Sequence, residues 1–307
     1  MKDYYNKAIE LISDIAFNST YPENEVEKEK EVILDEINSY LDSPAEEIYD
    51  EFENNLYKGH EMGRNILGTA ELVSKYTRND ICCFLSNNYS TDRMIIATIG
   101  DISFDKFKNK VTAHFNDYQK TSTTFHRTKF NALPTFDIIQ ERNSHLSHCI
   151  MGGLSYHIDD NKKMQMVLLN NILGGPGMNS RLNLNIREKY GFAYTIESQY
   201  NAYSDTGNFS IYMGVDPQSL DKAINLVLKE LDKLKQNKLG TIQLLNAQNQ
   251  LIGQLALSCE SSLGELLSIA RAGFSHEGIE PMHETVRKIR NLSASDILDV
   301  ANEIFDR

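Results

Sequence analysis

The chain has 307 residues, enough for two domains that each bury a sizeable core. Its hydrophobic content of 41% is ordinary for a soluble globular protein, and its net charge of -12 argues against nucleic-acid binding, which favours a basic surface. No apolar run reaches the roughly 18 residues that span a bilayer, and no signal peptide precedes the first helix, so we expect no membrane association.

The four cysteines are predicted to be reduced thiols. They lack Cys-x-x-Cys spacing, and the adjacent pair Cys82 and Cys83 does not suit a disulfide framework. Free thiols are typical of a reducing compartment, so we expect a cytoplasmic protein.

The first half of the chain is expected to be mainly helical. Apolar side chains recur at helical spacing over residues 3–16, and Pro22 followed by acidic residues opens a second helix. Residues 118–137 show no clear period and are rich in Thr, Ser and Lys, which is typical of a linker. The expected elements are helices over 3–16, 22–40, 44–56, 77–89 and 104–115, a glycine-punctuated loop over 59–69, and a strand over 93–100.

The second half is expected to combine strands with helices. The apolar run from His145 to His157 favours a strand, and the turn residues at 204–207 favour a hairpin. The expected elements are strands over 145–157, 192–203 and 208–215, and helices over 161–173, 178–190, 218–236, 240–258, 261–273 and 294–306. We therefore expect a first domain over 1–117, a linker over 118–137 and a second domain over 138–307.

The acidic stretch from Pro22 to Tyr40 carries the first candidate chemistry. At 100° per residue its apolar side chains share one face, and Glu29 and Glu36 fall about 20° apart on the flank of that face. Carboxylates beside a buried stripe need partners, because an unpaired charge there is costly. A metal ion, a basic group or water would each serve, and spacing alone favours a solvated acidic face.

Two short matches indicate an internal repeat. Residues Asn6–Leu11 match Asp221–Leu226 at an offset of 215. Residues Thr77–Ile81 match Ser293–Ile297 at an offset of 216, so one register holds across some seventy residues.

The repeat leads to two expectations. Glu29 and Glu36 correspond to Leu244 and Leu251, so the second copy lacks the paired carboxylates. The second copy also has a strand, two helices and a hairpin before its matching helix, whereas the first copy begins almost at that helix. We therefore expect about 80 residues of the first copy to be missing.

Three stretches resemble the pitrilysin/insulinase family of zinc peptidases, the inverzincins, especially its mitochondrial processing peptidase branch. Glu29–Glu36 is similar to the family's acidic motif, with two glutamates seven apart, and Gly59–Thr69 to its Gly-Arg-x-Ile-Leu-Gly segment. Gly174–Leu182 followed by Ile186–Tyr194 is similar to the second-domain signature. The resemblance covers essentially the whole chain. It implies two α+β domains of like fold, each an antiparallel sheet backed by helices, clamped around an extended peptide.

The resemblance also implies roles for individual residues. In such enzymes the first domain carries His-x-x-Glu-His, which supplies two zinc ligands and a general base, and the acidic motif supplies a third ligand. On that pattern Glu36 is the third ligand of Zn2+ and Glu29 a supporting acid of the site. Arg187 and Tyr194 would contact the substrate backbone or the developing oxyanion.

Each role in the second domain has a structural alternative. Arg187 could be a charge at a helix end, and Tyr194 a core tyrosine on a strand. Gly174 and Gly175 lie in a loop that would either contact the peptide substrate or serve only as a helix cap and turn.

The sequence contains no His-x-x-Glu-His. Only His145 and His148 lie close together, and a spacing of three on a strand directs them to opposite faces. Because one carboxylate cannot hold catalytic zinc, we expect zinc to be absent from this chain and the chain alone to be inactive. Three functions stay open: a zinc endopeptidase whose histidines lie elsewhere, a peptide-binding subunit that pairs with a catalytic partner chain or as a homodimer, and a structural relic.

Overall fold

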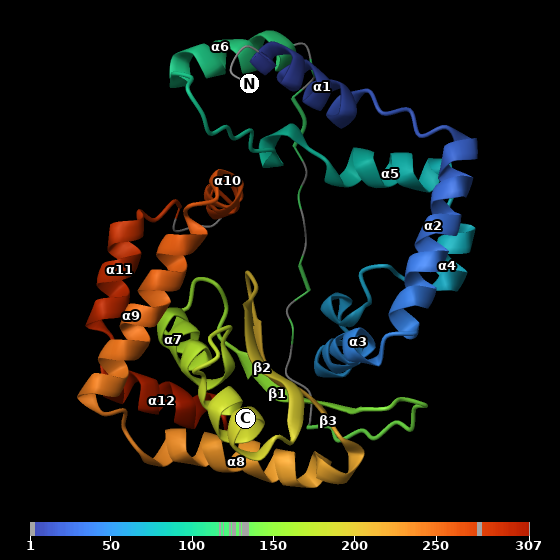
Figure 1. Ribbon diagram of the computed structural model, residues 1–307. Coiled ribbons are helices and arrows are strands. Elements are labelled where there is room, and N and C mark those ends of the chain that lie inside the picture. Colours follow the sequence, from blue (N-terminus) through green and yellow to red (C-terminus); the bar gives the residue numbers. More distant parts are fainter. Residues whose placement is uncertain are drawn as a thin grey trace. The chain divides into compact units, whose positions relative to one another are not determined.

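A computed structural model describes residues 4–116, 118, 120–122, 124, 127–128, 130, 135–274 and 278–306, and it has the expected α+β fold (Figure 1). The α-helices are α1 (Tyr5–Phe17), α2 (Glu23–Leu41), α3 (Pro44–Leu56), α4 (Ala70–Lys75), α5 (Arg78–Asn88), α6 (Phe104–Phe115), α7 (Lys163–Gly174), α8 (Leu220–Gln236), α9 (Thr241–Ser258), α10 (Ser262–Ala272), α11 (Met282–Asn291) and α12 (Ala294–Ile304). The strands are β1 (Ser147–Ser155), β2 (Ala193–Ala202) and β3 (Gly207–Val215). Short 3-10 turns are η2 (Glu61–Gly63), η3 (Thr91–Arg93) and η5 (Pro217–Ser219), and η4 (Asn183–Glu188) is a π-helix.

The chain divides into two compact units, each assembled from segments far apart in the sequence. Unit 1 consists of residues 1–39, 67–127 and 261–273. Unit 2 consists of residues 40–66, 128–260 and 274–307. Unit 1 therefore holds α1, α2, α4, α5, α6 and α10, whereas unit 2 holds the sheet with the other α-helices.

The sheet of unit 2 is antiparallel, with strand order β1-β3-β2. Met213 lies opposite Cys149 and Ile196 on one face, whereas its neighbour Tyr212 lies opposite Glu197 on the other. Because side chains alternate across a strand, the sheet has one apolar and one polar face. The central strand β3 is buried along its whole length.

The apolar face packs against α7, which contacts β2, and against α12, which contacts α7, α8 and β1 (Figure 1). Leu168 and Leu169 of α7, Val227 of α8 and Ile297 of α12 are all buried in this core. Burial of each such aliphatic side chain stabilises the folded state by about 1.5–3 kcal/mol. This cluster lies within unit 2 and is the main core among the described residues.

The polar face of the sheet is covered by α3, which contacts β1. Tyr49 of α3 donates a hydrogen bond to Glu197 at 2.9 Å, and burial raises the pKa of this tyrosine well above its usual range. Glu53 of α3 accepts hydrogen bonds from Asn208 at 2.9 Å and from Tyr203 at 3.2 Å. These bonds satisfy polar groups that would otherwise be costly to bury.

Unit 1 has a much smaller apolar interior. α1 contacts α6, and the ring of Phe17 stacks on Tyr118 with centroids 4.0 Å apart. Of the described residues in this unit, the hydrophobic residues that are buried are Ile9, Val26 and Val73.

The structure confirms the internal repeat helix by helix. At offsets of 215 to 216 residues, α1 matches α8, α2 matches α9, α3 matches α10, α4 matches α11 and α5 matches α12. Both α5 and α12 begin with a complete capping box, made by Thr77 with Asp80 and by Ser293 with Asp296. The third helix of each copy belongs to the other copy's unit, since α3 lies in unit 2 and α10 in unit 1.

Three sequence-based predictions about the elements are corrected. Residues 93–100 are not a strand, because no strand of the described chain pairs with them, although the backbone at Met94 is extended. The helices α4 and α11 lie where no element was expected. The helix predicted over 178–190 is largely the π-helix η4, with two α-helical residues on each side of it.

The expected linker 118–137 falls partly outside the described residues. Where it is described, it forms no regular element. Within the described parts of the chain, no helix combines the length and the apolar character needed to cross a bilayer.

Candidate functional site

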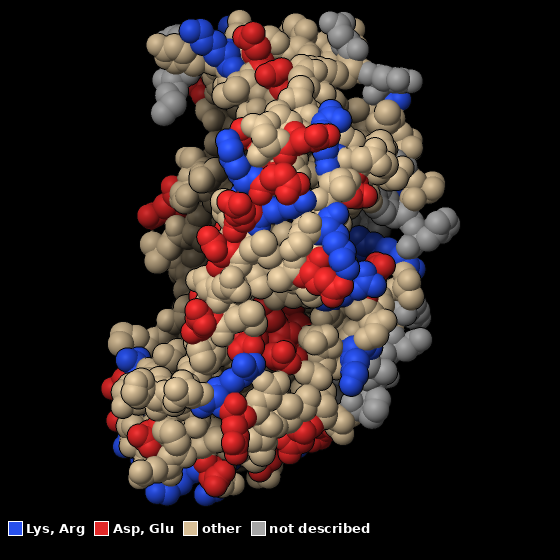
Figure 2. All heavy atoms as spheres, turned by 90° about the vertical axis from the view of Figure 1, so that its right-hand side faces the viewer, with Lys and Arg blue, Asp and Glu red and all other residues tan. Residues whose placement is uncertain are grey.

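The acidic helix α2 presents Glu29 and Glu36 to solvent. Both residues are exposed, and the buried side chain of this helix is Val26. In the view that faces α2, groups of acidic side chains alternate with Lys and Arg (Figure 2). Such a mixed surface is typical of a solvated face, and it leaves the two glutamates accessible to a ligand.

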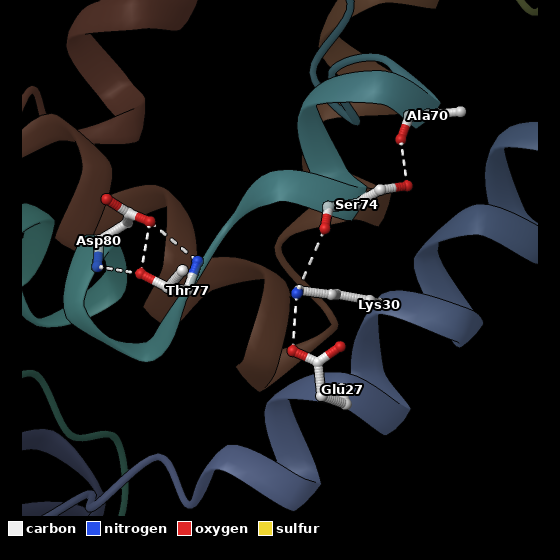
Figure 3. Close-up of polar contacts among 6 residues, drawn as sticks. All are labelled: Glu27, Lys30, Ala70, Ser74, Thr77 and Asp80. Carbon is white, nitrogen blue, oxygen red and sulfur yellow. Dashed lines mark hydrogen bonds and ion pairs between the residues drawn. The ribbon is translucent and has the colours of Figure 1, made fainter.

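Lys30 ties α2 to the short helix α4 (Figure 3). Its ammonium group donates to Glu27 at 2.7 Å and to the carbonyl oxygen of Ser74 at 3.4 Å. This cation is therefore engaged on the same helix as Glu29. Among the residues that the structure describes, no cation lies within ion-pair distance of Glu29 or Glu36.

A cavity of about 630 Å³ lies beside α2 within unit 1. Its lining is mainly apolar, and Glu29 belongs to it whereas Glu36 does not. The lining residues from α2, α4 and α5 are Glu25, Val26, Glu29, Lys30, Ile33, Val73 and Ile81. Glu29 thus places a carboxylate beside an apolar cavity of the size that small-molecule sites have.

The described part of the chain shows no cluster of metal ligands around Glu36. A catalytic zinc ion takes three protein ligands, and carboxylates bind it through oxygen at about 2.0–2.2 Å. Across the described ranges, no three His, Cys, Asp or Glu side chains lie close enough together to hold a metal ion. Within the described residues, Glu36 therefore does not belong to a three-ligand cluster of the kind that catalytic zinc needs.

In unit 2, the glycines that end α7 pack closely against neighbouring backbone. A Cβ on Gly174 would lie 2.6 Å from the backbone nitrogen of Ser198, and one on Gly175 would lie 2.7 Å from Cα of Asn171. Both glycines are buried, so tight packing explains why side chains are absent here. Contact of their backbone with a peptide stays a prediction.

Arg187 lies near the end of the π-helix η4 and is exposed. The amide of Lys189 donates to the carbonyl of Leu184, which is the five-residue spacing of a wide turn. The segment ends as expected at Gly191, which has a left-handed φ of +66 and whose amide donates to the carbonyl of Arg187 at 2.9 Å. Single π-turns inside helices are often found at functional sites.

Tyr194 lies at a β-bulge in β2. Ala193 pairs with Val215 and Thr195 pairs with Gly214, so Tyr194 is the extra residue of the ladder. A bulge redirects side chains locally, and Tyr194 is 66% exposed although it lies beside the buried Ala193. The alternative of a core tyrosine is therefore not supported by its exposure.

Arg187 and Tyr194 thus lie in one segment of unit 2, each at an irregularity of the backbone. Neither side chain has a hydrogen-bond or ion-pair partner among the described residues. Between them in the sequence, the rings of Tyr190 and Phe192 stack with their centroids 5.6 Å apart. The segment offers a guanidinium, a phenol and aromatic surface, which suits carbonyl and carboxylate groups of a peptide.

The structure also reveals polar residues that the sequence analysis missed. Glu197 and Gln199 lie on the polar face of the sheet, where both contact Tyr49. Polar residues at every second position of 195–201 were the available signal, because period-2 polarity is typical of a strand face. That pattern does not reveal which helix covers the face.

Comparisons with known proteins agree with this arrangement. The family model described as "Peptidase M16 inactive domain" matches residues 75–251. An uncharacterized zinc protease of Rickettsia felis is 30% identical over 306 residues, covering 98% of this chain and 72% of that protein. The uncharacterized zinc protease YmxG of Bacillus subtilis is 29% identical over 293 residues, covering 95% of this chain and 69% of that protein.

Two solved structures share the fold. A protease from Helicobacter pylori superposes with a TM-score of 0.88 at 22% identity, covering 99% of this chain and 75% of that chain. A peptidase M16 inactive domain from Pseudomonas fluorescens superposes with a TM-score of 0.87 at 20% identity, covering 97% of this chain and 71% of that chain. The chain therefore belongs to the peptidase M16 family, which confirms the resemblance to the pitrilysin/insulinase zinc peptidases that its motifs indicate.

Proposed function

We propose that this chain is the substrate-binding part of a zinc endopeptidase that cleaves extended peptides. The observation that carries the proposal is the exposed, unpartnered pair Arg187 and Tyr194, each presented at a backbone irregularity in unit 2. A guanidinium donates several hydrogen bonds in a fixed fork, and a phenol donates one more, so both can bind peptide carbonyl oxygens. Donors that meet the developing oxyanion would lower the barrier of the reaction.

In this proposal Glu36 serves as a metal ligand and Glu29 as its supporting acid. Both are carboxylates without a cation partner in the described part of the chain, which supports the assignment. The remaining ligands would be histidines of a His-x-x-Glu-His that the 307 residues do not contain. We derive from this that the chain alone neither holds catalytic zinc nor cleaves peptides. All four cysteines are free, which supports a reducing, cytoplasm-like location.

The inactivity of the isolated chain can be measured directly. We expect the purified protein to retain far less than one equivalent of zinc after dialysis and to leave unstructured peptides intact, since one carboxylate is too few ligands. Metal analysis and a chelator-controlled cleavage assay check this. Equimolar zinc together with chelator-sensitive cleavage would show that the site is complete within the chain.

Peptide binding to unit 2 is tested by Arg187→Ala and Tyr194→Phe. We expect Arg187→Ala to weaken the binding of a fluorescein-labelled unstructured peptide by about 10-fold or more, because a hydrogen bond to a charged group contributes about 1.5–3 kcal/mol. Tyr194→Phe removes one neutral donor and should have a smaller effect. In an enzyme to which the histidines have been restored, Arg187→Ala should lower the cleavage rate by roughly 10²–10³.

The matched control is Arg290→Ala, which removes another exposed arginine of unit 2. It should bind the peptide as the unchanged protein does. Circular dichroism should show that Arg187→Ala folds normally, because the guanidinium is exposed. If Arg187→Ala unfolded while Tyr194→Phe bound normally, both residues would be structural.

A second candidate function is a non-catalytic subunit that binds peptides beside a catalytic partner chain. It is favoured by the description of the matching family model as an inactive domain. This alternative predicts peptide binding that metal does not affect. It also predicts that restoring the His-x-x-Glu-His would give no cleavage.

A further inference from the structure

Two lysines and two aromatic rings form one cluster where η4 ends and α8 begins, and these two elements contact one another within unit 2. Nζ of Lys189 lies 5.3 Å from the ring centroid of Tyr190, and Nζ of Lys222 lies 5.8 Å from that of Phe192. The two rings stack on each other with an interplanar angle of 17°. Both distances are those of a cation–π interaction, so each ring of the stack holds one ammonium group.

The rings position these ammonium groups without neutralising them. The face of an aromatic ring attracts a cation through its quadrupole, but the ring carries no net charge. Lys189 and Lys222 are both exposed, and neither has a carboxylate within ion-pair distance in the described part of the chain. The same is true of Arg187, which lies two residues before Lys189. Their acidic neighbours in the sequence, Glu188 and Asp221, are exposed and pair with none of them.

Uncompensated lysines stand out in a chain that is rich in acid. The 43 Asp and Glu residues outnumber the 31 Lys and Arg residues, so carboxylates are plentiful partners for cations. Elsewhere in unit 2, Lys162, Lys233 and Lys235 each form an ion pair with a carboxylate. The cluster instead presents its positive charge to solvent, where an anion from another molecule can meet it.

Helix electrostatics account for one of the two lysines but not for the other. Lys189 directly follows η4, and a cation at that end of a helix interacts favourably with the helix dipole. Lys222 lies in the first turn of α8, where the dipole disfavours a cation. The stability of α8 therefore does not explain this lysine. The partial positive charge of the helix N-terminus also strengthens the positive potential beside Phe192.

We propose that this cluster selects peptides with acidic side chains, and that Lys189 and Lys222 are specificity-determining residues of the peptide site. The inference rests on the proposed function, in which Arg187 and Tyr194 of the same segment bind the peptide backbone. Lys189 lies between these two residues in the sequence, so a peptide bound to both is close to the cluster. The carboxylate of an Asp or Glu side chain accepts hydrogen bonds from the ammonium groups, which the stacked rings hold in place.

A pair of peptides that differ only in charge tests this selectivity. The probes are unlabelled, unstructured peptides that are acetylated and amidated at their ends, one with a central Glu-Glu and the other with Gln-Gln. Their side chains then carry the only carboxylates, and titration calorimetry measures both dissociation constants. We expect the Glu peptide to bind about tenfold more tightly at low salt, because two exposed ion pairs contribute about threefold each.

Variants of the lysines locate the selectivity. Lys222→Gln and Lys189→Gln should each reduce the preference about threefold, and the double variant should abolish it. Lys222→Arg keeps a cation over the ring and should retain the preference, whereas Lys222→Glu should favour the Gln peptide. Because both side chains are exposed, all of these variants should fold normally, which circular dichroism checks.

The matched control is Lys229→Gln, which removes the same charge from the same helix. Lys229 is an exposed lysine of α8 about two turns beyond Lys222, and it contacts no ring among the described residues. This variant should keep the full preference for the Glu peptide. An equal loss in Lys229→Gln and Lys222→Gln would show a general effect of net charge and would overturn the proposal.

The remaining outcomes separate this inference from the proposed function. Equal binding of the two peptides, or a preference that survives the double variant, would overturn the selectivity while peptide binding through Arg187 and Tyr194 still stands. Repeating the titrations with free C-termini identifies the carboxylate, since a gain only from the free terminus would contradict the assignment to side chains. If neither peptide bound, both the proposed function and this inference would fail.

Discussion

The helices α5 and α12 come from the same position of one repeat, yet they contribute very differently to their units. Both begin with a capping box, and both have eleven residues. α12 buries Ile297, Val300, Ala301 and Ile304, whereas α5 buries none of its side chains fully. The helix is therefore specified locally by its cap and spacing, and its contribution to stability depends on what packs against it.

The largest expected effect compares two isoleucines at matched positions. Ile297→Ala should destabilise unit 2 by about 2–5 kcal/mol, because Ile297 is buried in the main core. Ile81→Ala should cost less than about 1 kcal/mol, because Ile81 is only half-buried beside a cavity. Both losses of stability can be measured by urea denaturation, with hydrogen exchange in α5 and α12 as the readout for each unit. Equal losses would show that unit 1 has a core comparable to that of unit 2.

The next effect concerns α3 and α10, the matched helices that each belong to the other copy's unit. Glu53→Ala should cost about 1–3 kcal/mol, because it removes the partner of Asn208, which is buried on the polar face of the sheet. The counterpart of Glu53 is Ile269 of α10, which is exposed. Ile269→Ala should therefore stay within about 0.5 kcal/mol. A Glu53→Ala protein as stable as the unchanged one would mean that α3 is not held by this carboxylate.

Much of this architecture could be predicted from local patterns. The caps at Thr77 and Ser293, the turn after Ala202 and the glycine at 191 are local signals, and the structure has elements or turns at each of them. The segment 93–100 failed as a strand because a strand needs a partner, and no partner is present in the described chain. The residues of this segment favour extended backbone, but that preference does not supply the neighbouring strand with which they would form hydrogen bonds.

The candidate site could be predicted only in part. Family motifs pointed to Glu29, Glu36, Arg187 and Tyr194, and the structure shows all four to be exposed. The bulge at Tyr194 could not be predicted, because it depends on the register between β2 and β3. The assignment of α3 to unit 2 and of α10 to unit 1 depends on tertiary packing, and helical periodicity does not predict it.

The smallest expected effect is a pH dependence that belongs to unit 2. Nδ1 of His148 lies 2.8 Å from the hydroxyl of Tyr212, and the two rings stack with centroids 6.1 Å apart. Partial burial lowers the pKa of His148 below its usual value of about 6.5. The unfolded chain therefore binds a proton at a higher pH than the folded chain does. The stability that the neutral ring contributes is present above about pH 6.5 and is lost as pH falls through the lower pKa of the folded state.

We expect His148→Gln to remove this part of the pH dependence of unfolding, with a change below about 0.5 kcal/mol because the ring is partly exposed. The measurement is the difference in unfolding free energy between the variant and the unchanged protein, followed from pH 7.5 to pH 5. His114→Gln on α6 is the control in unit 1 and should leave the exchange of unit 2 unaltered at every pH. The opposite result would be a His148→Gln protein that is more stable than the unchanged protein at pH 7.5 and less stable at pH 5. It would show that the folded state favours the protonated ring, and that the hydroxyl of Tyr212 accepts from it and does not donate to it.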